Sequence, residues 1–194
     1  MKLSESEILD LLEKYYPSLS RDEVGILLSI STYKQVKKKV IIFEKGRKDK
    51  KVFILLKGSA RSYDNVDGLD ANCHLRSEGF IMGDARAFGD NQVLPLITKT
   101  ITDCDILIFD LGKLEAIALR NPKMMTFYLN LMKEVIVVFS HRIHTFVAMD
   151  ATERYLDLMK WNPLYLKSTF DKHLASFLGM SPLTYLRIKK KTIK

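Results

Sequence analysis

The first thirty residues show the apolar spacing of two short helices. Each run follows a Ser-x-x-Glu sequence, Ser4 to Glu7 and Ser20 to Glu23, whose hydroxyl and carboxylate can bind the free backbone amides of a first helical turn. Pro17 separates the two runs. The apolar residues recur at intervals of three and one, at Ile8, Leu11, Leu12, Val24, Leu27 and Leu28.

From about Val36 the pattern changes to short apolar runs that are typical of β-strands, at 40–43, 52–56 and 106–109. Six of the nine glycines lie between residues 46 and 89, where tight turns need the positive φ angles that glycine adopts easily. Because helical segments follow these strands as a block, the pattern predicts an α+β fold with a small antiparallel barrel or sandwich.

A long helix is predicted from about residue 124 to residue 149. Asp110 is expected to cap a helix that runs to Arg120, and Asn121-Pro122 to end that helix and begin the next. No Gly or Pro interrupts the long segment. Its apolar residues recur at alternating intervals of four and three, at Met125, Leu129, Met132, Ile136, Phe139, Ile143 and Phe146.

This stripe has the 3.5-residue period of a coiled coil and predicts that two copies of the chain associate along it. The alternative is a long helix inside a single core. We favour self-association because a helix of this length extends beyond the small β domain before it. Lys133 and Glu134 interrupt the apolar sequence, so no membrane span is predicted. The predicted dimerisation residues are Met132, Ile136, Phe139, Ile143 and Phe146.

Composition places the chain among globular proteins of one or two domains. Of its 194 residues 47% are apolar, and its two cysteines, Cys73 and Cys104, give no disulfide framework. The acidic start, with Glu5 and Glu7, does not fit a signal peptide, so a cytoplasmic location is predicted. The net charge of +8 is concentrated in residues 150–194, which hold nine Lys and Arg against four Asp and Glu. This basic segment favours an acidic partner.

Residues 171–190 match the pattern of a helix-turn-helix. Ala175 and Gly179 supply the small residue and the turn glycine four positions apart, and Ser181-Pro182 is a start signal for the second helix. The alternative is a pair of helices with no role in DNA binding. The apolar residues that would pack the two helices together are Leu174, Leu178, Met180, Tyr185 and Ile188.

If the second helix lies in the major groove, double-stranded DNA is the partner. Arg187 can then bind guanine through two hydrogen bonds, and Ser181 and Thr184 can reach phosphates. The lysines that follow supply charge for the DNA backbone. The predicted DNA-binding residues are Ser181, Thr184, Arg187, Lys189, Lys190 and Lys191.

With these motifs in place, the whole chain resembles the Crp/Fnr family of bacterial transcription regulators, which includes the cyclic-AMP receptor protein. It is most similar to the short members common in Bacteroidetes. The segments that carry the resemblance are Glu44-Lys45-Gly46, Phe53-Ile54-Leu55-Leu56-Lys57-Gly58, Asp67-Gly68, Gly79-Phe80-Ile81-Met82-Gly83-Asp84 and Leu174-Ala175-Ser176-Phe177-Leu178-Gly179-Met180-Ser181-Pro182.

The resemblance implies two domains. Residues 1–149 would form a cyclic-nucleotide-binding-like sensor, a β-roll with the long dimerisation helix from about residue 124. Residues 150–194 would form the helix-turn-helix DNA-binding domain, with Arg187 at a base-contacting position. A cytoplasmic homodimer that binds DNA follows from this, with RNA polymerase as a further implied partner.

The effector pocket departs from the pattern that the resemblance implies. Members that bind cyclic nucleotide carry a glutamate after the turn at Gly83, and an Arg-Ser pair further on whose arginine neutralises the phosphate. Here the glutamate position holds Asp84, and the pair aligns with Leu94 and Pro95. A buried phosphate with no cationic partner is costly. We therefore expect no binding of cyclic AMP, no other cofactor, and an effector of unknown identity.

No catalytic or metal site is predicted. No cysteine precedes Cys73, which excludes the amino-terminal cysteine cluster of an iron–sulfur sensor, and His141 and His144 are interpreted as exposed or dimer-facing. Nothing pairs a nucleophile with a base, so an enzyme is not expected. The alternative function is a ligand- or protein-binding signalling module whose degenerate helix-turn-helix no longer binds DNA, because Pro182, Leu183 and Leu186 make its outer face apolar.

Overall fold

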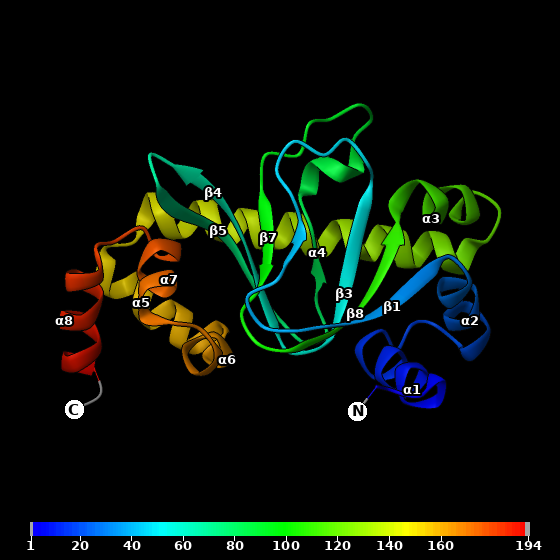
Figure 1. Cartoon of the computed structure of the whole chain (residues 1–194), viewed down its shortest axis with the longest axis horizontal. Helices are drawn as coiled ribbons and strands as arrows, with labels where there is room; N and C mark the ends of the chain where they lie inside the picture. Colours follow the sequence, from blue (N-terminus) through cyan, green and yellow to red (C-terminus); the bar gives the residue numbers. More distant parts are fainter. Residues whose placement is uncertain (1, 193–194) are drawn as a thin grey trace.

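The computed structural model describes residues 2–192, which form a β-roll, a long helix and a group of C-terminal helices (Figure 1). The strands are β1 Ser31–Val36, β2 Ile41–Phe43, β3 Lys51–Lys57, β4 Ser59–Val66, β5 Leu69–Ser77, β6 Ile81–Met82, β7 Ile97–Thr100 and β8 Cys104–Asp110. The helices are α1 Glu5–Tyr15, α2 Arg21–Ser29, the 3-10 helix η1 Ala85–Phe88, α3 Leu111–Ala118, α4 Pro122–Ala148, α5 Ala151–Trp161, α6 Pro163–Ser168, α7 Asp171–Phe177 and α8 Pro182–Thr192. The expected combination of a β-roll and a long helix is confirmed.

Two antiparallel sheets make up the roll, with strand orders β1-β8-β3-β6 and β2-β7-β4-β5. Strand β3 is buried on both faces. Val52, Ile54 and Leu56 face the cluster under the helices, whereas Phe53 and Leu55 face the cluster between the sheets. A strand buried on both faces is a continuous apolar run, which is why residues 52–56 are visible in the sequence.

Glycines allow the turns that close the roll. Gly58 joins β3 to β4 with φ +93°, and a Cβ atom there would lie 2.4 Å from the carbonyl oxygen of Asp103. Asp67 and Gly68 join β4 to β5 with φ angles of 51° and 80°, as a two-residue hairpin turn needs. This hairpin turn lies in the glycine-rich part of the chain, where the sequence predicts tight turns.

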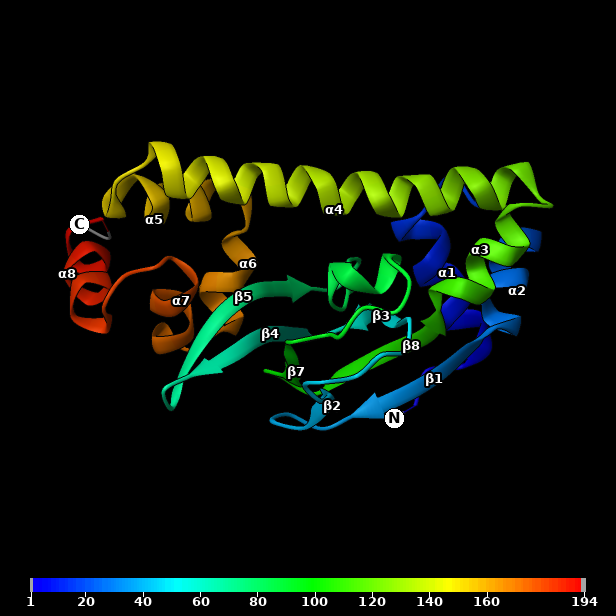
Figure 2. The same cartoon turned by 90° about the horizontal axis from the view of Figure 1, so that it is seen from above.

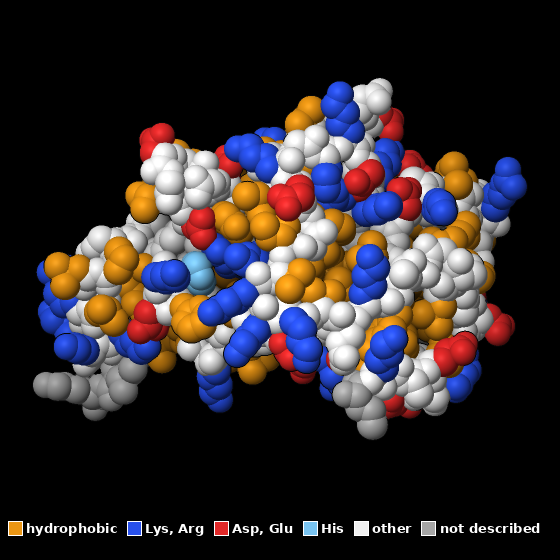
Figure 3. Space-filling view, in the orientation of Figure 1, with side chains coloured by type: hydrophobic (Ala, Val, Ile, Leu, Met, Phe, Trp, Pro, Cys, Tyr) orange, Lys and Arg blue, Asp and Glu red, His pale blue; other side chains and the backbone are white. Residues whose placement is uncertain are grey.

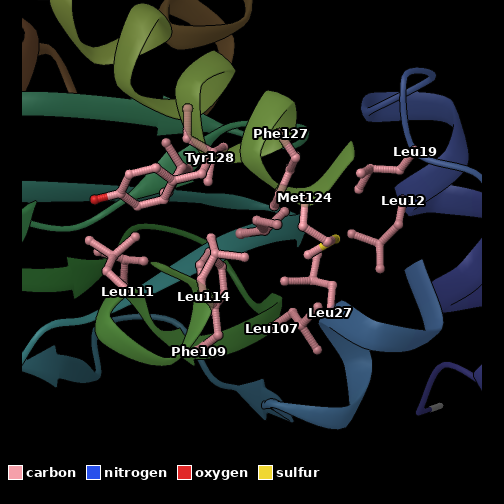
Figure 4. Packing of buried hydrophobic residues seen from close by; sticks show 14 of the residues in the cluster. Leu12, Leu19, Leu27, Leu107, Phe109, Leu111, Leu114, Met124, Phe127 and Tyr128 are labelled. Carbon is pink, nitrogen blue, oxygen red and sulfur yellow. The ribbon is translucent and has the colours of Figure 1, made fainter. Parts of the chain in front are cut away.

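The helices that precede the roll in the chain share one core with the helices that follow it. Both predicted capping boxes are present, at the starts of α1 and α2. Figure 4 shows Leu12 of α1, Leu27 of α2, Leu107 of β8, Leu114 of α3 and Phe127 of α4 packed together. Each of these side chains is at most 1% exposed, so the amino-terminal helices are part of the domain core.

Helix α4 extends along the whole molecule (Figure 2). The side-chain oxygen of Asn121 accepts hydrogen bonds from the backbone N–H groups of Lys123 and Met124, and Pro122 occupies the first turn, as predicted. Its 27 residues span about 40 Å. The residues that anchor it to the roll core lie near its amino terminus and are Met124, Phe127, Tyr128 and Leu131.

The apolar stripe of α4 is divided between two faces. Met132 packs against the roll core, and the ring of Phe139 lies 5.1 Å from the ring of His74 on β5. These residues contact their own chain and differ from the single outward stripe that the sequence pattern predicts. Three open members are spaced by seven residues and are 45%, 62% and 64% exposed, at Leu129, Ile136 and Ile143. Phe146 is also open, at 43% exposed, and its ring lies beside Gly179.

Several strands have no clear apolar signal, and the sequence pattern did not predict them. Strand β4 buries polar side chains that hydrogen bonds satisfy, such as Ser62, whose hydroxyl lies 2.7 Å from that of Thr98. The helix after Asp110 also ends earlier than expected, at Ala118 rather than Arg120. Pairing between strands therefore decides structure where local apolar periodicity is weak.

The C-terminal helices pack against the roll around Leu75 of β5 and Ile101, which join their apolar cluster. Buried members of this cluster from the helices are Tyr155, Leu158, Tyr165, Leu174, Ala175, Leu178, Tyr185 and Ile188. Helices α6 and α7 lie beside the β4–β5 hairpin, whereas α8 lies at the end of the molecule away from α1 and α2 (Figures 1 and 2).

Hydrogen bonds fix α7 to this hairpin. The Ser176 hydroxyl accepts a hydrogen bond from the backbone N–H of Asn72 at 3.0 Å and donates one to the carbonyl of Asp70 at 2.6 Å. The buried Arg61 of β4 donates to the Asp70 carboxylate at 2.6 Å and to the Asn72 side-chain oxygen at 2.9 Å. We call this set of four residues the hairpin contact.

Substitution of Ser176→Ala removes both hydrogen bonds of the hydroxyl and leaves the Asn72 amide without its partner. We expect a loss of about 1–2 kcal/mol in the free energy that holds α7 against the hairpin. Hydrogen exchange of the Asn72 amide should accelerate about tenfold or more. Ser168→Ala is the matched control, because the Ser168 hydroxyl bonds to Leu164 within its own helix. Unchanged exchange at Asn72 would contradict the proposed strength of this contact.

Candidate nucleic-acid interface and roll pocket

A glycine turn joins α7 to α8 next to the end of α4. Gly179 has φ +63°, and a Cβ atom there would lie 2.4 Å from a ring carbon of Phe146. Leu174, Ala175 and Tyr185 are fully buried between the helices. The turn at Gly179 and the burial of Leu174 and Tyr185 agree with the local expectations from the sequence.

Ser181 caps α8, as predicted. Its hydroxyl accepts a hydrogen bond from the backbone N–H of Thr184 at 3.1 Å and lies 2.9 Å from the Thr184 hydroxyl. The contact between the Ser181 and Thr184 hydroxyls fixes the position of both at the first turn of the helix. Ser181 is exposed and Thr184 half-buried, so both remain at the surface.

Helix α8 has one buried and one open side. Tyr185 and Ile188 pack inward. Opposite them, a set of exposed residues with helical spacing lies on a single side of the helix. Figure 3 shows basic and apolar side chains next to one another over α8. We call this set the outward face of α8; it consists of Leu183, Leu186, Arg187 and Lys190, which with Thr184 line a shallow groove of about 430 Å³.

The three predicted lysines do not share one surface. The Lys189 ammonium lies 2.7 Å from the Asp171 carboxylate, so this lysine turns toward α7. Lys190 belongs to the outward face of α8. Lys191 lines a second groove of about 430 Å³, together with Arg187 and the first residues of α5.

Two arginines that the sequence analysis did not single out hold the end of α7. Arg142 of α4 donates to the carbonyl of Phe177, and Arg154 of α5 donates to the carbonyl of Leu178 at 2.8 Å. Burial lowers the pKa of Arg142 to about 10. No local pattern reveals these residues, because their partners lie 35 and 24 positions away in the chain.

The roll pocket lies between β5, β6, η1 and α4. Gly83 and Asp84, two of the four residues predicted for the effector pocket, are among its lining residues. Leu94 and Pro95 do not belong to its lining; Leu94 is buried in the roll core and pairs with the backbone of Arg47. The free volume of about 30 Å³ is room for about one or two water molecules. Typical small-molecule sites have about 300–1,000 Å³.

Two acidic groups in and beside this pocket, Asp84 and Glu134, each have one buried carboxylate oxygen, Oδ2 and Oε1, that finds no hydrogen-bond partner among the described residues. One Asp84 oxygen accepts a hydrogen bond from the backbone N–H of Arg86 at 2.9 Å. Burial lowers the pKa of His74 to about 3, helped by the positive charge of Arg76. Arg76 lies near the hydroxyl of Tyr165, where its positive charge opposes the rise that burial causes in the pKa of Tyr165. Close by on α4, burial raises the pKa of Glu134 to about 7.

The sequence of the roll is similar to a known domain family. Residues 33–121 match the model of the cyclic nucleotide-binding domain. The match covers β1 to the start of α4 and includes the residues of the roll pocket, except those on α4 itself. A comparison with the sequences of curated proteins gives no significant match.

Solved structures with this domain share the fold over most of the chain. FixK2 from Bradyrhizobium japonicum has a TM-score of 0.71 at 14% identity, over 84% of each chain. CLP, the c-di-GMP responsive global regulator of Xanthomonas campestris, has a TM-score of 0.68 at 14% identity, over 89% of this chain and 91% of CLP. The Catabolite Activator Protein of Thermus thermophilus has a TM-score of 0.56 at 17% identity, over 91% and 85%. The resemblance to Crp/Fnr regulators is thus confirmed as a likeness of fold.

Residues 2–192 contain neither a membrane-spanning helix nor a group of metal ligands. No helix there is long and apolar enough to cross a membrane. Within the same residues, no three His, Cys, Asp or Glu side chains are grouped as metal ligands would be.

Proposed function

We propose that this protein is a homodimeric, DNA-binding transcription regulator of the Crp/Fnr type, and not an enzyme. Residues 1–149 would be the sensor domain and residues 150–194 the DNA-binding domain. The outward face of α8 is the observation that carries the proposal: a basic helix follows a glycine turn, packs on α7 through its inner side and leaves its outer side open. Its DNA target implies action in the cytoplasm, with RNA polymerase as a further partner.

Contacts of α8 with DNA would divide into two kinds. Arg187 is exposed in the middle of the outward face and suits the paired acceptors of guanine in the major groove. Ser181 and Thr184 at the helix start, and Lys190 and Lys191 near its end, suit phosphates. Lys189 would contribute less, because its ion pair with Asp171 has to be broken first.

The open part of the α4 stripe supports a dimer. Leu129, Ile136 and Ile143 lie on one line along the helix and stay exposed. Val137 and Val147 widen this surface and are 62% and 81% exposed. A second copy of α4 would cover them through coiled-coil packing. A two-fold dimer would present two α8 helices to half-sites about 34 Å apart.

We also propose that the effector is not a cyclic nucleotide. The pocket is too small for one without rearrangement, and the position at which the resemblance implies a phosphate-binding arginine holds the buried Leu94. Arg76 lines the pocket at a different position, on strand β5, where its charge also acts on Glu134 and Tyr165. CLP responds to c-di-GMP; no nucleotide is proposed for the present chain.

The second candidate function is a signalling module whose helix-turn-helix no longer binds DNA. The observation that favours it is the apolar part of the outward face, where Leu183 is 79% exposed and Leu186 is 42% exposed. DNA-binding experiments separate the two functions directly.

Gel shifts with a pool of random duplexes at two salt concentrations should retain DNA, more weakly at the higher concentration, and enrich a palindrome. Arg187→Ala should then weaken the enriched site by about tenfold or more and relax its sequence preference. Lys190→Ala should weaken all duplexes alike, and Lys167→Ala on α6 is the control for charge alone. No retained DNA even at low salt would favour the signalling module.

Substitution of Ile136→Asp together with Ile143→Asp should convert the dimer to a monomer in light scattering, because two buried carboxylates per helix would oppose the coiled coil. Leu119→Asp is the matched control; this leucine is 73% exposed but lies after α3, outside the stripe. A double variant that remains dimeric with a normal melting temperature would exclude α4 as the interface.

Isothermal titration with cyclic AMP and with cyclic GMP should give no saturable heat in a preparation that retains DNA. The reason is the closed pocket and the missing cation at Leu94. A dissociation constant in the micromolar range or below for either nucleotide would overturn this part of the proposal.

A further inference from the structure

The outward face of α8 combines two chemistries in a fixed order. Leu183 is 79% exposed, and Leu186 and Arg187 follow one turn later, about 5 Å further along the helix axis. Lys190 completes the face after another turn. Leu186 lies on one side of the line from Leu183 to Lys190 and Arg187 on the other. Two apolar side chains, Leu183 and Leu186, therefore stand where a helix that contacts polar base edges would carry hydrogen-bonding groups.

The position of these leucines is rigid. Tyr185 and Ile188 on the opposite side are buried, and the Tyr185 ring lies 5.5 Å from that of Tyr155 in an edge-to-face contact. Ser181 caps the helix. Within residues 2–192 no element covers the outward face, and a groove of about 430 Å³ remains beside it. The leucines are thus held out toward whatever binds α8.

The major groove of DNA offers one apolar group to such side chains, the C5 methyl of thymine. A leucine opposite the edge of guanine, cytosine or adenine would instead bury polar atoms that lose their water and gain no hydrogen bond. The leucines therefore favour thymine in two ways. They contact its methyl group, and they disfavour the other bases, whose polar atoms would be buried without a hydrogen bond.

On the basis of the proposed DNA binding, we propose that Leu183 and Leu186 are specificity-determining residues that contact thymine methyl groups beside the guanine bound by Arg187. The base-pair rise of about 3.4 Å and the helix rise of about 1.5 Å per residue place residues three and four apart over neighbouring base pairs. Each half-site then contains a guanine with thymines next to it, on either strand.

The test uses the duplex enriched from the random pool and replaces single thymines with deoxyuridine, which removes only the methyl group. For the full-length protein we expect the dissociation constant to rise about fourfold at one or two thymines per half-site, the effect of one buried methyl. Thymines elsewhere in the same duplex should show no change. In Leu186→Ala or Leu183→Ala the penalty at the matching thymine should disappear.

Leu164→Ala is the control variant, because Leu164 is 52% exposed but lies on α6. It should keep the full deoxyuridine penalty. If DNA is retained but deoxyuridine has no effect at any position, or the leucine variants keep the penalty, the thymine contacts are excluded while the proposed function stands. If no duplex is retained at all, both proposals fail.

Discussion

The hairpin contact between strand β5 and helix α7 sets the position of α8, and with it the candidate DNA interface. Side chains alternate along a strand. His74 and Arg76 of β5 therefore line the roll pocket, whereas Leu75 between them packs among the C-terminal helices. One strand thus forms a wall of the pocket and a support of α7. A movement of β5 at the roll pocket has to be accommodated by the C-terminal helices, and the reverse also holds, because both faces of the strand are closely packed.

Helix α4 connects the same two regions by a different route. Its first half is part of the roll core, and its last turns reach Gly179 through Phe146 and the Phe177 carbonyl through Arg142. Leu129, Ile136 and Ile143, which are seven residues apart, remain exposed on the surface of the helix. The helix therefore divides its apolar residues between the fold of one chain and the surface that would meet a second chain. The stripe is therefore continuous in the sequence, although some of its residues pack against their own chain and others stay exposed.

The roll keeps the frame of a cyclic nucleotide-binding domain while its pocket is closed. Gly83 and Asp84 lie in the expected place, but Leu94 belongs to the core. Burial without a full set of partners raises the pKa of Glu134 to about 7, close to the pocket wall. The roll therefore resembles a cyclic nucleotide-binding domain in its fold, whereas its pocket has a free volume of only about 30 Å³ and has Arg76 in its lining.

Features that act within a few residues followed from the sequence by itself: the capping boxes of α1 and α2, the start of α4 at Asn121, and the glycine turn before Ser181. Caps and turns depend on hydrogen bonds between near neighbours, so their patterns are local. The open side of α8 also followed, because helical spacing alone separates Arg187 from Tyr185. Only the tertiary structure decided that Lys189 pairs with Asp171, that Leu94 is in the core and that Ser176 binds the hairpin. These contacts join segments that are distant in the chain, and no local pattern specifies which polar group meets which.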